Sequence, residues 1–156
     1  MTPRKEIYIK IKEALNAISE LQYIDLYRNQ FSMENYPDNM VSALIRINKI
    51  DWINMTEQNQ EGTATVDIIL YCRDGWMDQH NNTHDPDHGF NEIDLMDLIA
   101  EKIQFLEGDQ FKALHHFEDE TEDQEMKGIF SYRQSFSFNL FRKIAPKYQT
   151  KTITVL

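Results

Sequence analysis

The first apolar residues of the chain recur with the period of a helix. They are three or four residues apart, which places them on one face: Ile7, Ile11, Leu15, Ile18 and Leu21. Thr2 can cap this helix and Pro3 suits its first turn. We therefore expect an amphipathic N-terminal helix that continues to Leu21.

Alternation of apolar and polar residues then predicts strands. A short strand is expected over residues 24–31 and a longer one over residues 41–47, which have a single apolar face. The residues between them form a turn-rich connector, and Pro37 in it would not suit a central strand.

The next segment predicts a long hairpin. The apolar phase shifts at Ile50 and Trp52, which indicates a β-bulge near residues 48–49. Residues 56–62 are polar and are expected to form the hairpin tip, and residues 64–72 alternate again as the returning strand. The outer part of this hairpin is expected to project beyond the core.

A loop and a second helix follow. Residues 74–89 show no period, and loops of that length are usually functional or mobile. Asn91 is expected to cap the helix and Gly108 to end it. The apolar face predicted for this helix consists of Ile93, Met96, Ile99, Ile103 and Leu106.

The C-terminal third predicts an acidic turn followed by two more strands. Six of the eight residues 118–125 are acidic, and we expect a solvated turn there. Residues 130–140 alternate, with aromatic residues in one phase and polar residues in the other, which predicts one apolar and one wet face. Residues 150–156 alternate too, and could close the sheet or add to the edge of a neighbour.

Together these elements predict an α+β fold with an antiparallel or mixed sheet of four to five strands. Two helices are expected on one face of the sheet, with the long hairpin projecting. The 156 residues suit a single domain, with a core over residues 1–144 and a C-terminal tail over residues 145–156.

The charge narrows the possible functions. The formal net charge is −10, which disfavours nucleic-acid binding as the main role. The sequence has neither a run of 18–20 apolar residues nor a signal-peptide core near its first residue, so we expect no membrane partner and a cytoplasmic site of assembly. Cys72 is the only cysteine and is expected to be buried and inert.

Three histidines raise a metal hypothesis. His80, His84 and His88 are four residues apart, and three imidazoles with an open position could activate water in a metal-dependent hydrolase. That spacing brings ligands together only on a helix, and Pro86 resists one, so a polar surface loop is favoured. Motifs of nucleophilic or phosphate-binding enzymes are missing, and we expect no enzyme and no cofactor.

Contacts with other proteins are the favoured use of the surface. Trp52 and Trp76 fall outside a clean core period, and a partly exposed Trp is enriched at binding hot spots, although local packing is an equal alternative. The residues predicted to contact partners lie in the hairpin, the loop and the acidic turn: Trp52, Glu57, Glu61, Trp76, Asp78, Glu120, Glu122 and Asp123.

The order of the elements resembles the tail terminator, or tail-completion, proteins of long-tailed bacteriophages. The resemblance covers residues 7–141, from the first helix through the polar-tipped hairpin to the aromatic strand, and departs at residues 74–89 and 145–156. It implies a structural protein that forms a homo-oligomeric ring, often a hexamer, on the tail tube protein. Such a ring ends tube polymerisation, meets the head–tail connector protein and is part of the virion tail.

Three other functions stay open. A different head–tail connector or minor tail component would share the same plan. A protein-binding module unrelated to phages would share only the fold class, and the hydrolase would depend on His80, His84 and His88.

Overall fold

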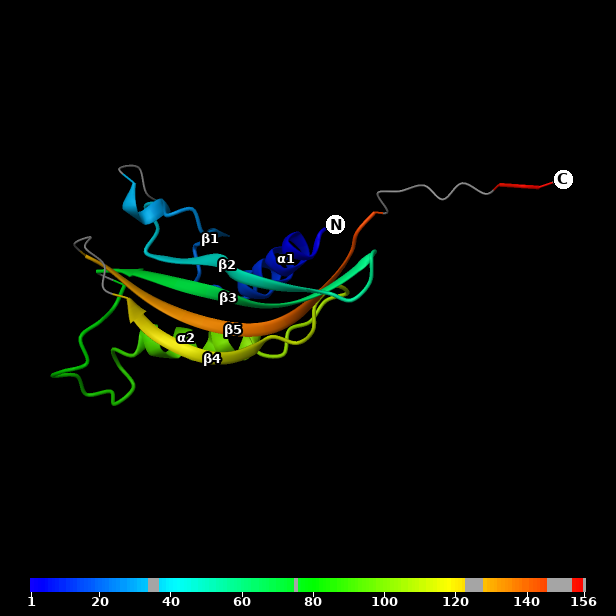
Figure 1. Cartoon of the computed structure of the whole chain (residues 1–156). Helices are drawn as coiled ribbons and strands as arrows, with labels where there is room; N and C mark the ends of the chain where they lie inside the picture. The colour runs from blue at the N-terminus through cyan, green and yellow to red at the C-terminus, as the bar shows by residue number, and fades with distance from the viewer. Residues whose placement is uncertain (34–36, 75, 123–127, 146–152, 156) are drawn as a thin grey trace.

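A computed structural model describes residues 1–33, 37–74, 76–122, 128–145 and 153–155, apart from the side chain of residue 54. It contains a five-stranded mixed sheet with both helices packed against one face (Figure 1). The elements, in chain order, are α1 (Pro3–Asn16), β1 (Tyr23–Leu26), the 3-10 helix η1 (Gln30–Ser32), β2 (Val41–Asn54), β3 (Asn59–Arg73), α2 (Asn91–Ile103), β4 (His115–Glu122) and β5 (Ile129–Lys143).

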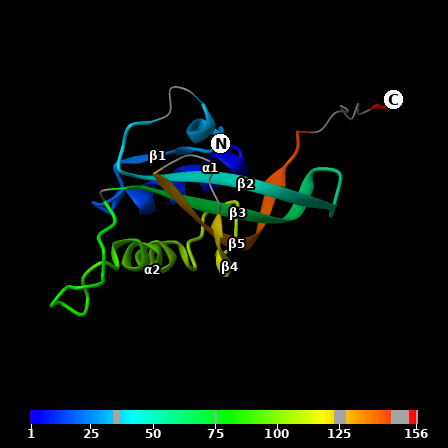
Figure 2. The same cartoon turned by 90° about the vertical axis from the view of Figure 1, so that its left-hand side faces the viewer.

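The strands are arranged in the order β1-β2-β3-β5-β4. β1 runs parallel to β2, and every other neighbouring pair is antiparallel. The predicted α+β class, with a mixed sheet and two helices on one face, is therefore confirmed. Figure 2 shows the sheet from one end, with α2 below and the β2–β3 hairpin extending away from it.

The first helix is shorter than predicted. Pro3 occupies its first turn as expected, but the helix ends at Asn16. Thr2 caps it through its backbone carbonyl, which accepts the N–H of Glu6 at 3.1 Å, without a side-chain bond. Ile18 and Leu21 still reach the core, from the turn that follows the helix. The apolar period continued because the turn packs on the same sheet.

The strand predicted over residues 24–31 is also too long. β1 ends at Leu26, and Asn29 adopts a left-handed conformation with φ 58°, which a strand cannot continue through. Phe31 lies in η1 and stacks on Tyr71, with ring centroids 4.2 Å apart. Phe31 is therefore buried on the face of the sheet away from the helices.

The long hairpin is confirmed, including its bulge. The register of β2 and β3 shifts between Ile47 and Lys49, as the change of phase predicted. The tip is shorter than expected, because β3 begins at Asn59. Gly62 belongs to this strand and lies against Trp52: a Cβ there would be 3.0 Å from the indole ring.

α2 begins within one residue of its predicted start but ends about one turn early. Phe90, not Asn91, is its N-cap, and the helix ends at Ile103, well before Gly108. The chain leaves the helix in an extended conformation at Gln104 and turns at Phe105, where φ is 64°. The buried face of α2 contains Leu95 rather than Ile93, which is 46% exposed.

The acidic turn predicted over residues 118–125 is wrong for residues 118–122, which belong to β4. They pair with β5 because their alternate carboxylates meet Arg133. Residues 123–125 lie outside the described residues, as do most of residues 150–156, where a terminal strand was predicted. Of that segment, Ile153 and Val155 are described, and both are more than 80% exposed.

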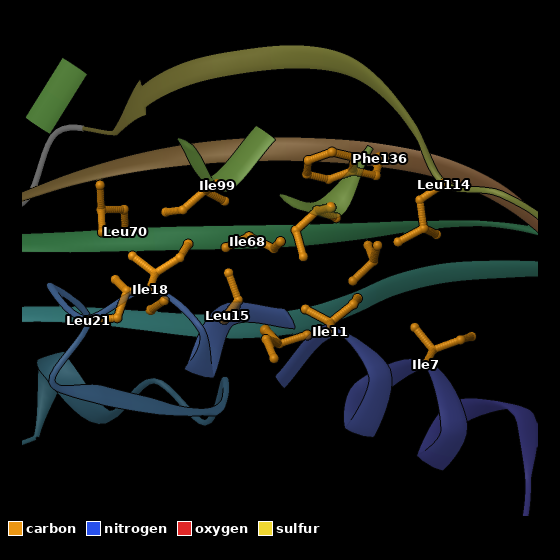
Figure 3. Close-up of a cluster of buried hydrophobic side chains, with 14 of the residues drawn as sticks. Ile7, Ile11, Leu15, Ile18, Leu21, Ile68, Leu70, Ile99, Leu114 and Phe136 are labelled. Atoms are coloured by element: carbon orange, nitrogen blue, oxygen red, sulfur yellow. The ribbon is translucent and has the colours of Figure 1, made fainter. Parts of the chain in front are cut away.

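The main core lies between the helices and the sheet (Figure 3). Ile7, Ile11 and Leu15 of α1 and Ile99 of α2 meet Phe136 of β5 and the even-numbered side chains of β3. Cys72 ends that row, is buried as predicted, and has a thiol pKa raised to about 12 by burial and by the charge of Glu92. The helices therefore cover one face of the sheet and, within the described residues, leave the other face without an α-helix.

Candidate functional site

The face of the sheet that lies opposite the helices, called here the open face, is built from three zones. An apolar zone surrounds Tyr71, where Phe31, Leu44, Ile69 and Ile129 pack together. A charged zone occupies the middle of the sheet, and a polar groove lies beyond it. Because adjacent residues of a strand point to opposite faces, all three zones come from the same strands as the core.

Asp67 of β3 is at the centre of the charged zone. Asp67 is 0% exposed. Its carboxylate accepts hydrogen bonds from Arg46 Nη2 at 2.8 Å, Asn48 Nδ2 at 2.7 Å and Ser135 Oγ at 2.7 Å. Arg133 Nη1 lies 3.9 Å away. A buried carboxylate is tolerated only when it is paired in this way, so Asp67 fixes the relative position of β2, β3 and β5.

Arg133 connects this centre to the edge strand β4. Its guanidinium contacts Glu120 closely and lies 3.4 Å from both Glu118 and Glu122. Burial alone would lower the pKa of Arg133, but the hydrogen bond to Glu120 and the charge of Asp67 raise it overall. The wet face predicted for β5 is thus wrong in part: Ser131 and Ser135 are buried beside Arg133.

The polar groove has a volume of about 450 Å³ and lies where the sheet continues toward the hairpin tip. Its polar lining consists of Lys49, Asp51, Thr63, Thr65, Lys112, His115, Ser137 and Asn139. Lys49 and Asp51 are 3.5 Å apart, and both side chains are more than 60% exposed. The groove therefore presents two ammonium groups and several hydroxyls around a single carboxylate.

The hairpin residues predicted to contact partners differ in exposure. Trp52 packs against the edge of the core, and the guanidinium of Arg142 lies 4.1 Å from the centroid of its ring. Glu57 is fully on the surface at the hairpin tip, and Glu61 is half-buried within β3. Beside them, Ile53 and Met55 are about 60% exposed, and neither was among the residues predicted to contact partners.

The loop over residues 76–90 holds its own shape through local contacts. His80 Nδ1 lies 2.6 Å from the His88 carbonyl, and the His80 ring stacks on Phe90 with centroids 4.6 Å apart. Trp76 packs against the core, and its carbonyl accepts a bond from Asn91 Nδ2 at 3.2 Å. Both predicted tryptophans therefore contribute to packing, and Asp78 stays exposed.

The three histidines of this loop do not converge. His84 is exposed, and His88 Nε2 is 3.9 Å from Asp78. Across the described ranges, no three His, Cys, Asp or Glu side chains come together in a way that could hold a metal ion. Of the predicted acidic contacts, Glu120 and Glu122 face Arg133, and Asp123 lies outside the described residues.

Sequence reasoning missed Asp67, Arg133 and the groove. A signal was present, because Asp67 interrupts an otherwise apolar strand, but nothing in the sequence indicates which cation it meets. In the part of the chain that the structure describes, no helix is both long and apolar enough to cross a bilayer. Neither a protein-family model nor a curated protein matches this chain.

Proposed function

We propose that this chain is a structural protein of a phage or prophage tail. It forms a ring at the head-proximal end of the tail tube, ends tube polymerisation and joins the tail to the head connector. The observation that supports this most is the arrangement of the fold: both helices are used for the core, while the hairpin tip, the loop over residues 76–90 and the open face remain for contacts.

The hairpin tip has the composition of a docking element. Ile53 and Met55 are exposed apolar side chains next to the acidic Glu57, at the end of a rigid pair of strands. Exposed apolar side chains surrounded by polar ones are typical of protein interfaces. A tip of this kind would suit contact with the last ring of the tube.

The first test is the mass of the assembly. A hexamer of this 18.6 kDa chain has a mass of about 112 kDa, and light scattering with negative-stain electron microscopy would detect a closed ring. The measurement is made on the protein alone and with the tube protein encoded in the same gene cluster. A chain that stays monomeric in both samples and leaves tube length unchanged would refute the proposal.

The second test uses the hairpin tip. Met55→Ser combined with Glu57→Lys should prevent capping, so that tubes grow longer in its presence than with the wild-type chain. Ile93→Ser is the matched control, because Ile93 is a similarly exposed apolar residue on α2, away from the tip. Equal capping by the tip variant and the control would show that the tip is not the tube contact.

A further inference from the structure

The polar groove on the open face is unusual for a chain of formal net charge −10. Lys49 and Lys112 lie at its sides with His115, and the only carboxylate in its lining is Asp51. The ion pair between Lys49 and Asp51 is exposed, so it is weak, and Lys49 can exchange its partner. The groove is thus suited to a ligand that carries carboxylates.

Two β-bulges, one in β2 and one in β4, bring the residues of this groove onto the open face. The register shift after Ile47 turns Lys49 onto the open face, and the shift after His116 places His115 on the open face as well, on the same side of the sheet as the glutamates of β4. As a result, one row of paired residues crosses four strands at the groove: Lys49, Thr65, Ser137 and His115. The hydroxyls of this row can donate to a carboxylate held between the cations.

The opposite end of the molecule carries an acidic projection. The loop over residues 76–90 extends beyond the sheet at the end away from the hairpin tip (Figure 1). Asp78, Asp85 and Asp87 are exposed there, and the loop is braced by Thr83, whose Oγ1 donates to the His80 carbonyl at 2.7 Å. The carboxylates are therefore presented on a formed loop.

We infer that the acidic loop of one copy docks in the polar groove of the next copy. This inference rests on the proposed self-assembly and names the surfaces that carry it. The two surfaces are different and lie at opposite ends of one chain, so the contact is head-to-tail, and it closes into a ring when the rotation between copies permits.

Other acidic segments fit the groove less well. The glutamates of β4 already surround Arg133 of their own chain. The hairpin tip belongs to the same end of the molecule as the groove and has only Glu57 beyond β2. Among the described residues, the loop is the segment that combines projection with exposed carboxylates.

Two charge-reversed variants test the contact. The groove variant carries Lys49→Glu and Lys112→Glu, and the loop variant carries Asp85→Lys and Asp87→Lys. Each should self-associate at least about tenfold more weakly than wild type in sedimentation equilibrium. An equimolar mixture should assemble again, because each reversed surface meets its complement on the other variant.

Matched controls carry the same charge changes elsewhere. Lys5→Glu with Lys10→Glu changes exposed cations of α1, and Asp97→Lys with Glu101→Lys changes exposed acids of α2. Both should assemble like wild type. Asp51→Asn removes the carboxylate of the groove and should strengthen assembly. Circular dichroism and the thermal midpoint confirm that each variant is folded.

The outcomes separate this inference from the proposed function. If wild type forms rings and both reversed variants do so equally well, the loop–groove contact is wrong while the ring stands. If the mixture rescues assembly but the assembly neither binds nor caps tubes, the contact is right and the tail function is wrong. Failure of the mixture to assemble when both variants are folded also overturns the contact.

Discussion

Val66 and Asp67 are neighbours in β3, yet they meet entirely different surroundings. Val66 faces the helices and pairs across the sheet with Phe136. Asp67 faces the open side, where Arg46 and Ser135 donate hydrogen bonds to its carboxylate. Both residues are 0% exposed. One strand therefore contributes to two interiors, an apolar one under the helices and a polar one without any helix above it.

The two interiors differ in how strongly their interactions depend on direction. Apolar burial is proportional to area and tolerates small changes of angle, so the helix-covered face holds the layers together without fixing their alignment closely. Hydrogen bonds to a buried carboxylate require particular donors at particular distances. The open face therefore determines how β2, β3 and β5 align, and the charged zone gives the groove beyond it a fixed floor.

The largest effect is expected under the helices. Phe136→Ala should lower the free energy of unfolding by about 4 kcal/mol, because it leaves a cavity between the sheet and the helices. Phe130→Ala is the control: Phe130 lies in the same strand and phase but is 46% exposed, and the loss should be about 1 kcal/mol or less. Urea titrations measure both. Equal losses would show that the helix-covered face is not the main core.

The next effect is expected on the open face. Asp67→Asn should lower the free energy of unfolding by about 3 kcal/mol, because an amide N–H₂ would then face the donors of Arg46 and Asn48. Asp51→Asn changes an exposed carboxylate on the same face and should cost about 0.5 kcal/mol or less. Chemical denaturation compares them. A loss at Asp67 no greater than at Asp51 would mean that the buried network adds no stability.

The dependence of stability on alkaline pH tests both faces of the sheet, because the neighbours Tyr71 and Cys72 are titratable and lie on opposite faces. Burial raises the pKa of Cys72 under the helices to about 12 and raises the pKa of Tyr71 on the open face as well. The unfolded chain loses the Cys72 proton from about pH 9 upward, while the folded chain keeps it until about pH 12.

The contribution of Cys72 to stability is therefore fully present below pH 9 and is lost as the pH rises toward 12. The loss should reach about 1.4 kcal/mol per pH unit. Cys72→Ala should flatten the pH profile of the free energy of unfolding between pH 9 and 10, and Tyr71→Phe should flatten it from a higher pH. Parallel profiles for Cys72→Ala and wild type would contradict the burial of the thiol.

The smallest effect on stability is expected at the hairpin end of the sheet, where Trp52 packs at the edge of the core. Arg142→Gln removes the guanidinium that lies over Trp52 and should lower the free energy of unfolding by about 0.5–1 kcal/mol. Lys143→Gln, an exposed neighbour, should leave stability unchanged. Thermal melts at low and high salt measure both. A null result for Arg142 would assign Trp52 entirely to apolar packing.

The periodicity of apolar residues predicted the elements of the helix-covered face, because the side chains that point toward that core are apolar. It gave both helices, the bulge before Lys49 and the α+β class. It failed at boundaries such as Asn16 and Ile103, where turns pack their own apolar side chains on the sheet. The open face could not be predicted, because Asp67 and Arg133 are far apart in sequence and only the pairing of β3 with β5 brings them together.

The bulge in β2 also determines what a change in gene length would do to this protein. Asn48 is the extra residue between Ile47 and Lys49, and it resets the alternation of everything from there to the tip. Losing that one codon would make Ile47 and Lys49 direct neighbours, which point to opposite faces as they do now, so Lys49 would stay on the open face and Ile50 over the core. We therefore expect deletion of Asn48 to cost mainly its hydrogen bond to Asp67, whereas deletion of Asp51, within the regular pairing, would turn Trp52 onto the open face.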